Sequence, residues 1–354
     1  MKPRTLLAAL LLLTTITATA QTPAQQLAIR LQRIQQKGIM FGHQDDPFYG
    51  LTWEYQKGRS DTRDLTGDYP AVMGFDLGGI EKGDSKDLDS VPFRLIHDEA
   101  LAHARRGGIV TFSWHPRNPL TGGNAWDVKD TTVVRSILPG GSQNAKFQTW
   151  MKRVADFLVT LTDKHGNKIP IIFRPWHEMN GSWFWWGQKI CTDEEYKALW
   201  NMLQDYLTSR GLDNLLYCYS PNLDGSWTTE RYLKRYPGDA RVDIIGEDAY
   251  QWGTEADFIK LTNADLTFVR EFAKEHNKLY VLSECGYKNN PDSTWWTRVL
   301  MPILREYHVL YFLPWRNYKE EYFGPSRDEH SAANFLELYK QKDMLFLKDI
   351  KKVK

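Results

Sequence analysis

The sequence predicts a (β/α)8 barrel. Eight apolar runs of strand length alternate with amphipathic stretches of helical length along a chain of 354 residues. Several runs are continuously apolar and are bounded by turn residues, which is typical of buried parallel strands. Polar or aromatic residues stand at the carboxyl end of nearly every run, the end where such a barrel carries its active site.

The eight predicted strands follow one another at fairly regular intervals. They cover residues 38–43, 69–76, 108–115, 169–178, 215–220, 242–250, 279–284 and 309–316. The alternative fold is a doubly wound open sheet. It is disfavoured because no glycine-rich phosphate turn follows the first strand.

The clearest predicted helix lies between the fourth and fifth strands. Thr192 and Glu195 form a capping box at its start, its apolar residues share one face, and Gly211 ends it. The other predicted helices cover residues 93–106, 145–164, 256–275 and 293–306.

The first 20 residues resemble a secretory signal peptide. A basic start leads into an apolar run at 6–13 and a small-residue cleavage site at 18–20. A membrane anchor would need about 20 apolar residues, which this run does not reach. We therefore expect one catalytic domain at residues 21–354, exported without a membrane anchor and either periplasmic or secreted.

Composition narrows the class of ligand. A formal net charge of +1 gives no reason to expect nucleic acid as a partner. The 14 tryptophans favour a flat, uncharged ligand such as a sugar. The odd number of cysteines, three, indicates structural thiols rather than a disulfide scaffold.

Two glutamates stand out among the residues at the strand ends. Those residues are His43, Asp76, Trp114, His115, His177, Glu178, Asn222, Asp248, Tyr250, Glu284, Trp315 and Arg316. Glu178 ends the fourth strand and Glu284 the seventh, so in a closed barrel they face one another across the mouth. A glycosidic bond is cleaved by such a pair, one group donating a proton and the other attacking or activating water. The plainer alternative is that each glutamate is solvated or forms a salt bridge.

Four segments resemble glycoside hydrolase family 26, whose best-known members are β-mannanases. They are FRPWHEMNGSWFWWG (173–187), VLSECGY (281–287), FGHQDDPFYG (41–50) and SWHPRNP (113–119). The resemblance implies a retaining hydrolase in which Glu178 is the acid/base and Glu284 the nucleophile. His177 stands where most of the wider clan has asparagine. We expect it to bond near the nucleophile or the sugar, the alternative being a core histidine.

The resemblance also assigns five supporting positions. Tyr250 would bond the nucleophile, and Trp183 would line the site close to the acid. His115 would lie near the cleavage position, Trp315 under the sugar being attacked, and Arg316 at the next sugar outward.

Two further residues are expected to bind substrate. Trp126 is a plausible cleft wall, and Asp248 is expected to orient His177 or a sugar hydroxyl. Of the neighbouring rings Phe184, Trp185 and Trp186, we expect at least two to pack in the interior, because adjacent residues cannot all face one cleft.

The resemblance implies a β-1,4-mannan, glucomannan or galactomannan substrate. The alternatives are β-1,3-xylan or mixed-linkage β-glucan, a mannobiose-releasing chain-end enzyme, and a non-catalytic carbohydrate-binding barrel. A long insertion at 122–150 is expected to shape the cleft. We expect no metal and no cofactor, because two carboxylates suffice for this chemistry. The protein is expected to be a monomer.

Overall fold

A computed structural model of the chain describes residues 20–353. The signal peptide predicted at residues 1–20 lies outside the described residues, apart from its last residue. The description below therefore concerns the chain from Ala20 onward.

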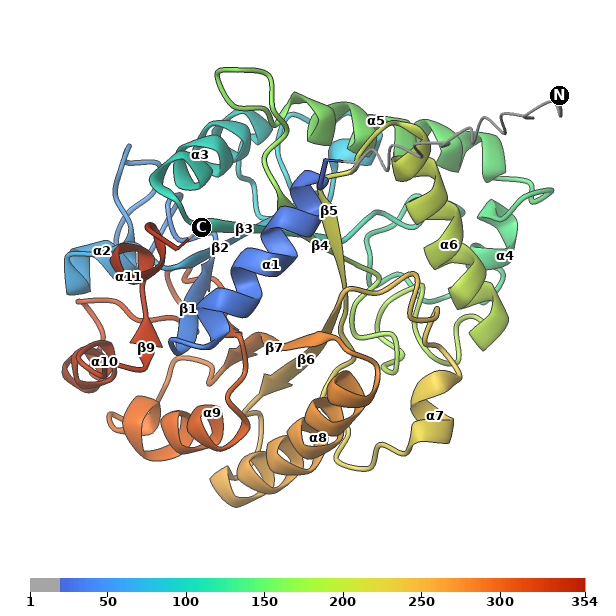
Figure 1. Cartoon of the computed structure of the whole chain (residues 1–354). Coiled ribbons are helices and arrows are strands. Elements are labelled where there is room, and N and C mark those ends of the chain that lie inside the picture. Colours follow the sequence, from blue (N-terminus) through green and yellow to red (C-terminus); the bar gives the residue numbers. More distant parts are fainter. Residues whose placement is uncertain (1–19, 354) are drawn as a thin grey trace, which may run out of the picture.

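Eight parallel strands close into a barrel, which confirms the predicted fold (Figure 1). They are β1 (Ile39–Gln44), β2 (Val72–Asp76), β3 (Ile109–Trp114), β4 (Ile171–Pro175), β5 (Leu215–Tyr219), β6 (Ile244–Tyr250), β7 (Leu279–Gly286) and β8 (Tyr311–Pro314). Each strand pairs with the next, and β1 pairs with both β2 and β8, so the ring is complete. A two-residue strand, β9 (Met344–Leu345), adds to the start of β1.

Helices surround the barrel. The longer ones are α1 (Pro23–Gln35), α3 (Phe93–Arg106), α5 (Asn144–Thr160), α6 (Asp193–Ser209) and α8 (Glu255–Glu275). The shorter ones are α2 (Asp61–Thr66), α4 (Val133–Ile137), α7 (Thr229–Leu233), α9 (Met301–Tyr307), α10 (Ala332–Tyr339) and α11 (Leu347–Ile350), with a 3-10 turn η1 (Ile80–Lys82).

Two predicted helices have instructive outcomes. The capping box of α6 forms as predicted, with Thr192 and Glu195 each accepting from the other's backbone amide. The helix predicted at 293–306 instead begins as a π-helix, η2 (Trp296–Leu300), and continues as α9. Pro302 has no amide hydrogen to give to the preceding turn, so a regular α-helical ladder cannot run through this point.

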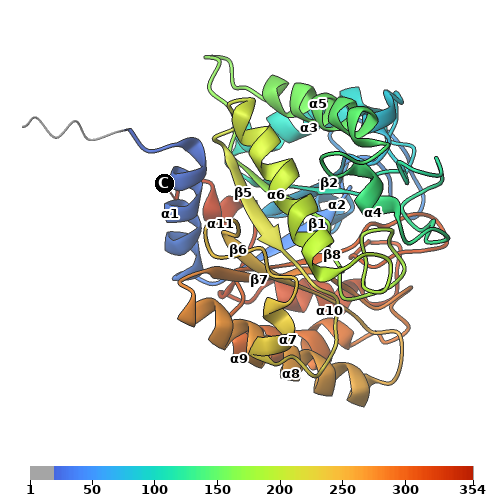
Figure 2. The same ribbon diagram turned by 90° about the vertical axis from the view of Figure 1, so that its right-hand side faces the viewer.

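Helix α1 closes the end of the barrel where the strands begin. Leu27, Leu31 and Ile34 are buried against the first residues of the strands, in one apolar cluster with Met40 and Val72. Figure 2 shows α1 on one side of the molecule and the strands running away from it. The opposite end, formed by the loops that follow the strands, is the end left for a binding site.

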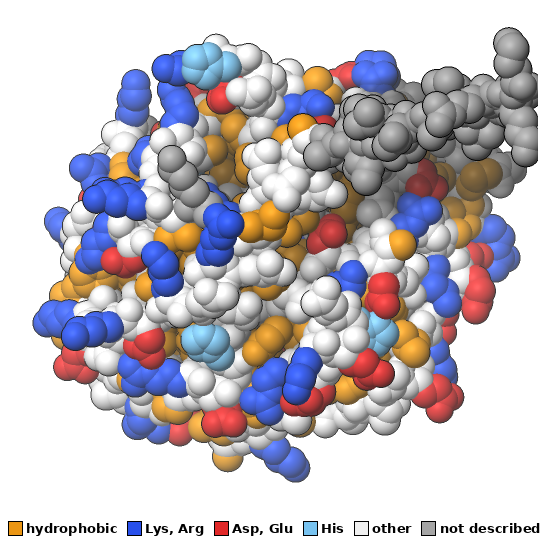
Figure 3. Space-filling model, in the orientation of Figure 1, with side chains coloured by type: hydrophobic (Ala, Val, Ile, Leu, Met, Phe, Trp, Pro, Cys, Tyr) orange, Lys and Arg blue, Asp and Glu red, His pale blue; other side chains and the backbone are white. Residues whose placement is uncertain are grey.

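The face that carries α1 has mixed charge. Figure 3 shows Lys and Arg side chains interspersed with Asp and Glu over this face. Among residues 20–353, none of the helices combines the length and apolar character needed to cross a bilayer. The three cysteines are buried and free.

Removal of a buried side chain from α1 tests whether packing of this helix against the barrel end stabilises the fold. We expect Leu31→Ala to lower the free energy of unfolding by about 2–5 kcal/mol, because Leu31 is fully buried. Chemical denaturation measures this change. The matched control is Gln32→Ala on the exposed face of α1, which should change stability by no more than about 0.5 kcal/mol. Equal losses in the free energy of unfolding for the two variants would contradict the stabilising role of the buried face of α1.

Candidate active site

The chain leaves β4 along an unusual backbone path. Trp176 and Glu178 both have left-handed conformations, with φ of 54° and 52°. The Glu178 amide donates to the carbonyl of Ser220, 2.7 Å away, which ties this segment to the end of β5. Left-handed backbone costs about 1–2 kcal/mol per non-glycine residue, and such strain is concentrated at functional sites. Here it accompanies a Glu178 that lines the cleft while the Trp176 ring is fully buried.

The Glu178 carboxylate accepts two hydrogen bonds. One oxygen accepts from the Trp183 indole at 2.7 Å and the other from the Asn222 amide at 2.9 Å. Burial, and next the charge of Glu284, raise the pKa of Glu178 to about 7 despite these two donors. A carboxyl group with this pKa holds a proton for part of the time near neutrality, so it can act as both acid and base.

The Glu284 carboxylate faces two strong donors. The Arg174 guanidinium forms an ion pair with one oxygen, and the Tyr250 hydroxyl donates to the other at 2.6 Å. Burial, followed by the charge of Glu284, raises the pKa of Tyr250 well above its ordinary value, so the phenol keeps the proton it donates. A positive charge and a phenol on opposite oxygens suit a carboxylate that must remain an anion.

Arg174 is shared between two strands opposite β4. One nitrogen pairs with Glu284 on β7, and another donates to Asp248 on β6 at 2.8 Å. The second Asp248 oxygen accepts from the hydroxyls of Ser220 at 2.8 Å and Ser283 at 2.6 Å. Burial opposes the charge of Arg174, but the two carboxylates outweigh it and raise the pKa of Arg174.

Asp248 differs from its predicted role. It is fully buried, it does not line the cleft, and its partners are Arg174 and two serines rather than His177. The expectation that it orients His177 or a sugar hydroxyl is therefore wrong. Its contact with the site runs through Arg174, which holds the Glu284 carboxylate.

A β-bulge on β7, beside Asp248, explains why Ser283 and Glu284 both point to the same side of the sheet although they are adjacent in sequence. Glu247 pairs with Leu282 and Asp248 with Glu284, so Ser283 is an extra residue on β7. In a regular strand, side chains alternate between faces, whereas a bulge turns adjacent side chains toward the same side. Ser283 thus reaches Asp248 while Glu284, the next residue, lines the cleft.

Two histidines form a chain that ends near Glu284. Asp76 accepts from His115 Nδ1 at 2.6 Å, and Nε2 of His115 lies 2.9 Å from Nε2 of His177. Nε2 of His177 is 4.0 Å from Glu284. Burial, then the positive charge of Arg174, lower the pKa of His177 well below its ordinary value, so this imidazole stays neutral. His177 therefore lies in the site, as predicted, rather than in an unrelated part of the core.

These groups line a cleft of about 550 Å³. Its walls include every predicted site residue except Asp248, namely Glu178, Glu284, His177, Tyr250, His115, Trp126, Trp183, Trp315 and Arg316. They also include Leu88, Asp89, Phe184, Asn222, Trp252, Glu321 and Phe323, to which the sequence analysis gave no role in binding or chemistry. Asn222 follows β5, and its position at a strand end is the sequence feature that could have predicted its place in the cleft. The other residues lie on loops, where no periodic pattern predicts the direction of a side chain.

The aromatic cluster divides between the cleft and the interior. Trp183 is 39% exposed, whereas Trp185 and Trp186 are fully buried, as predicted for at least two of these rings. Phe184 touches the cleft but stacks on Trp186 with ring centroids 4.5 Å apart. The buried rings thus form a rigid base beneath the exposed one.

The cleft continues beyond the catalytic pair into a second hollow of about 360 Å³. The two hollows share Leu88, Asp89, His115 and Trp126. Asp89 also pairs with Arg316, at 3.0 Å.

The stretch 122–150 is only in part a loop. It contains α4 and the first turns of α5, and its irregular start brings Trp126 to the cleft wall.

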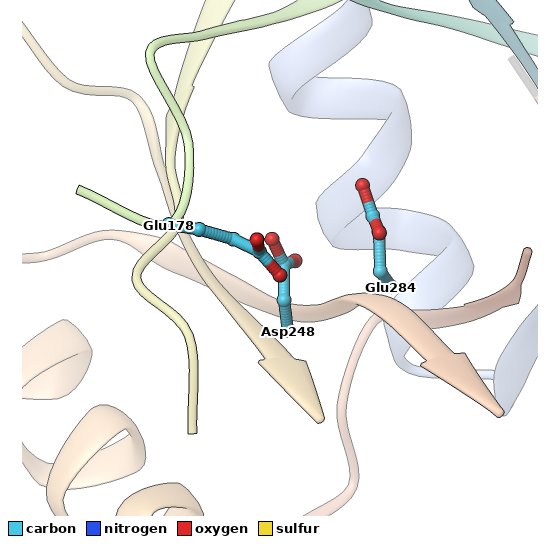
Figure 4. Close-up of side chains that lie close together, drawn as sticks. All are labelled: Glu178, Asp248 and Glu284. Carbon is cyan, nitrogen blue, oxygen red and sulfur yellow. The ribbon is translucent and has the colours of Figure 1, made fainter. Parts of the chain in front are cut away.

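Three carboxylates come close together. One oxygen each of Glu178, Asp248 and Glu284 lies within 4.8 Å of the others (Figure 4). This set would be the candidate ligand group for a cation, but Arg174 already supplies a positive charge to two of its members. The approach of a Glu178 oxygen to within 4.8 Å of a Glu284 oxygen is closer than the ~6.5–9.5 Å between the carboxyl groups of inverting glycosidases.

Comparison with known proteins places the chain among carbohydrate hydrolases. Residues 16–323 match the profile of glycosyl hydrolase family 26. A mannan endo-1,4-β-mannosidase of Bifidobacterium adolescentis is 36% identical over 281 residues, 77% of this chain. The chain covers only 27% of that relative's length.

Solved structures agree in fold over nearly the whole chain. A β-mannanase of this family from Bacteroides ovatus has a TM-score of 0.91 and 44% identity, over 94% of this chain and 98% of that one. The catalytic domain of an endo-β-1,4-mannanase from Bacillus sp. JAMB-750 has a TM-score of 0.85 and 30% identity, over 94% of each chain.

Removal of the neighbouring charge tests the electrostatics of the pair. We expect Glu284→Gln to lower the pKa of Glu178, because the negative charge that raises it is gone while burial remains. A pH titration of the carboxyl ¹³C signals measures the shift. Glu81→Gln, which neutralises another buried carboxyl group, should leave the Glu178 titration unchanged. A Glu178 pKa that does not move in the Glu284 variant would contradict the coupling.

Proposed function

We propose that this chain, which belongs to glycosyl hydrolase family 26, is a retaining β-mannanase acting on β-1,4-mannosidic linkages. The observation that carries the mechanism is the close pair of carboxylates, of which Glu178 has a pKa of about 7 and Glu284 is paired with Arg174. The relatives named above, all mannanases, support the substrate.

In the first step, Glu284 attacks the anomeric carbon and forms a covalent glycosyl ester. The bond from that carbon to the glycosidic oxygen breaks, and Glu178 gives its proton to the departing oxygen. Arg174 and Tyr250 hold the attacking carboxylate in place from its two oxygens. The positive charge that develops on the sugar is stabilised by this same carboxylate.

In the second step, the ionised Glu178 takes a proton from water. The hydroxide so formed attacks the anomeric carbon, the ester bond to Glu284 breaks, and the carboxylate is restored. Two displacements at one carbon return the original configuration. Glu178 ends the cycle protonated, as it began.

The remaining cleft residues position the sugar. Trp315 would lie beneath the ring under attack and Arg316 beside the next sugar, where its pairing with Asp89 fixes its direction. His115 and the neutral His177 offer hydrogen-bonding groups near Glu284, suited to the axial 2-hydroxyl of mannose.

Several finer points belong to the proposal. Glucomannan and galactomannan are expected substrates along with mannan. The second hollow beside the catalytic pair accommodates sugars beyond the one attacked, whether the enzyme cuts internally or releases mannobiose from an end. We also propose that the protein is exported by its signal peptide to the periplasm or the medium, and that it acts as a monomer.

Loss of the nucleophile tests the mechanism. We expect Glu284→Ala to lower kcat on soluble galactomannan by ~10⁴-fold or more. Reducing-sugar release measures turnover, with mixed-linkage glucan and β-1,3-xylan run in parallel. Glu321→Gln removes another carboxylate that lines the cleft and should retain activity within a few fold.

Proton NMR of the first products should show the β-anomer, and the α-anomer would overturn retention. Cleavage of another glycan alone would overturn the substrate, and cleavage of none would favour a binding barrel.

The acid role of Glu178 predicts the alkaline side of the pH profile. The first step needs the proton, so kcat/KM should fall about tenfold per pH unit above about pH 7, where Glu178 ionises. Trp183→Phe removes a hydrogen bond that favours the ionised form, so it should raise this pKa and move the fall to higher pH. Trp126→Phe changes another cleft indole that does not bond Glu178 and should leave the position of the fall unchanged. A fall that stays in place in Trp183→Phe would contradict the assignment.

A further inference from the structure

The exposed tryptophans of the described chain all lie at the cleft. Among residues 20–353, these are Trp126, Trp183 and Trp252, and each lines the same hollow as Glu178 and Glu284. Trp252 is the most exposed of them, at 67%, although indole is costly to leave in water. Single exposed apolar residues are common, so exposure alone assigns no role. The surroundings of Trp252 carry the argument further.

The Trp252 ring is held in a fixed orientation. It stacks on Tyr250 with centroids 5.5 Å apart and planes at 28°, and it meets Phe323 edge-on at 6.0 Å. Tyr250 and Phe323 also contact each other, at 5.3 Å. Tyr250 thus supports one face of the indole and Phe323 makes an edge contact, while most of the side chain stays open to solvent.

The backbone before Trp252 is equally constrained. Gln251 is buried, its amide donates to the carbonyl of Gly286 at 2.9 Å, and its side chain accepts from the Trp295 indole at 2.7 Å. The loop between β6 and α8 is thereby fixed to β7. A flat apolar surface held rigid in advance loses little conformational freedom when a ligand covers it.

Trp252 does not line the second hollow, which is walled in part by Asp89, the partner of Arg316. The second hollow shares Leu88, Asp89 and Trp126 with the cleft but not Trp252. Trp252 instead adjoins Tyr250, whose hydroxyl bonds the nucleophile. Of the exposed indoles, Trp126 is therefore shared with the second hollow, whereas Trp252 is not.

We propose that Trp252 is the stacking surface for a sugar on the leaving-group side, at least one ring beyond the bond that is cut. This inference rests on the proposed function, in which Trp315 and Arg316 hold the sugars on the other side. The negative face of the indole attracts the C–H bonds on one face of a neutral pyranose ring. Such a surface suits an uncharged β-linked sugar and provides no hydrogen-bond acceptor for a charged ligand.

The position at which a labelled oligosaccharide is cut tests this inference. With mannopentaose carrying ¹⁸O at its reducing end, we expect Trp252→Ala to shift cleavage toward that end, so that fewer sugars depart. KM should rise about 3- to 10-fold, the effect of losing one aromatic contact. Trp252→Phe keeps a ring and should restore most of the wild-type pattern. Trp126→Ala, at the other end, should shift cleavage in the opposite direction.

A mannobiosyl fluoride separates stacking from damage to the catalytic groups. Its fluoride leaving group has no ring to stack, so Trp252→Ala should cleave it at the wild-type rate. An equal loss on the fluoride and on mannopentaose would mean that Trp252 acts only by supporting Tyr250, and would overturn the inference. So would an unchanged cleavage pattern when the wild type is active. A wild type inactive on both compounds would instead remove the proposed function, and this inference with it.

Discussion

The site depends on one buried charge, the guanidinium of Arg174. It lies on β4 and pairs with Asp248 on β6 and Glu284 on β7, so it joins three strands beneath the cleft. All three side chains are almost wholly buried, and an uncompensated charge there would cost several kcal/mol. Each charged side chain of this group therefore compensates the charge of its partners and lowers the cost of burying them. This requirement holds the Glu284 carboxylate in its position.

The two buried glutamates have different surroundings. Glu284 lies against a positive charge and a phenol, whereas Glu178 meets only the neutral donors Trp183 and Asn222. Desolvation raises the pKa of Glu178, and the nearby charge of Glu284 adds to the effect. Two identical side chains thus have different partners, and this difference supports the proposed division of roles between them.

The aromatic rings contribute at two levels. Trp185 and Trp186 are interior and give the loop after β4 a rigid base, whereas Trp126, Trp183 and Trp252 expose flat faces to the cleft. Rings fixed by other rings keep their orientation without a ligand. The cleft is therefore shaped in advance, and binding of the proposed substrate would need little reordering of the protein.

The sequence by itself determined the eight strands, the major helices and the two glutamates, because apolar periodicity and strand ends are local properties. It could not determine where side chains point once a strand departs from regular geometry. The bulge on β7 turns the Ser283 hydroxyl toward Asp248, which binds Arg174 beneath the cleft, contrary to expectation. The left-handed Glu178 lies at a turn that no pattern marks. The loop residue Trp252 likewise gained its place only through Tyr250 and Phe323. Such directions follow from contacts between distant segments, and those contacts exist only after the barrel has closed.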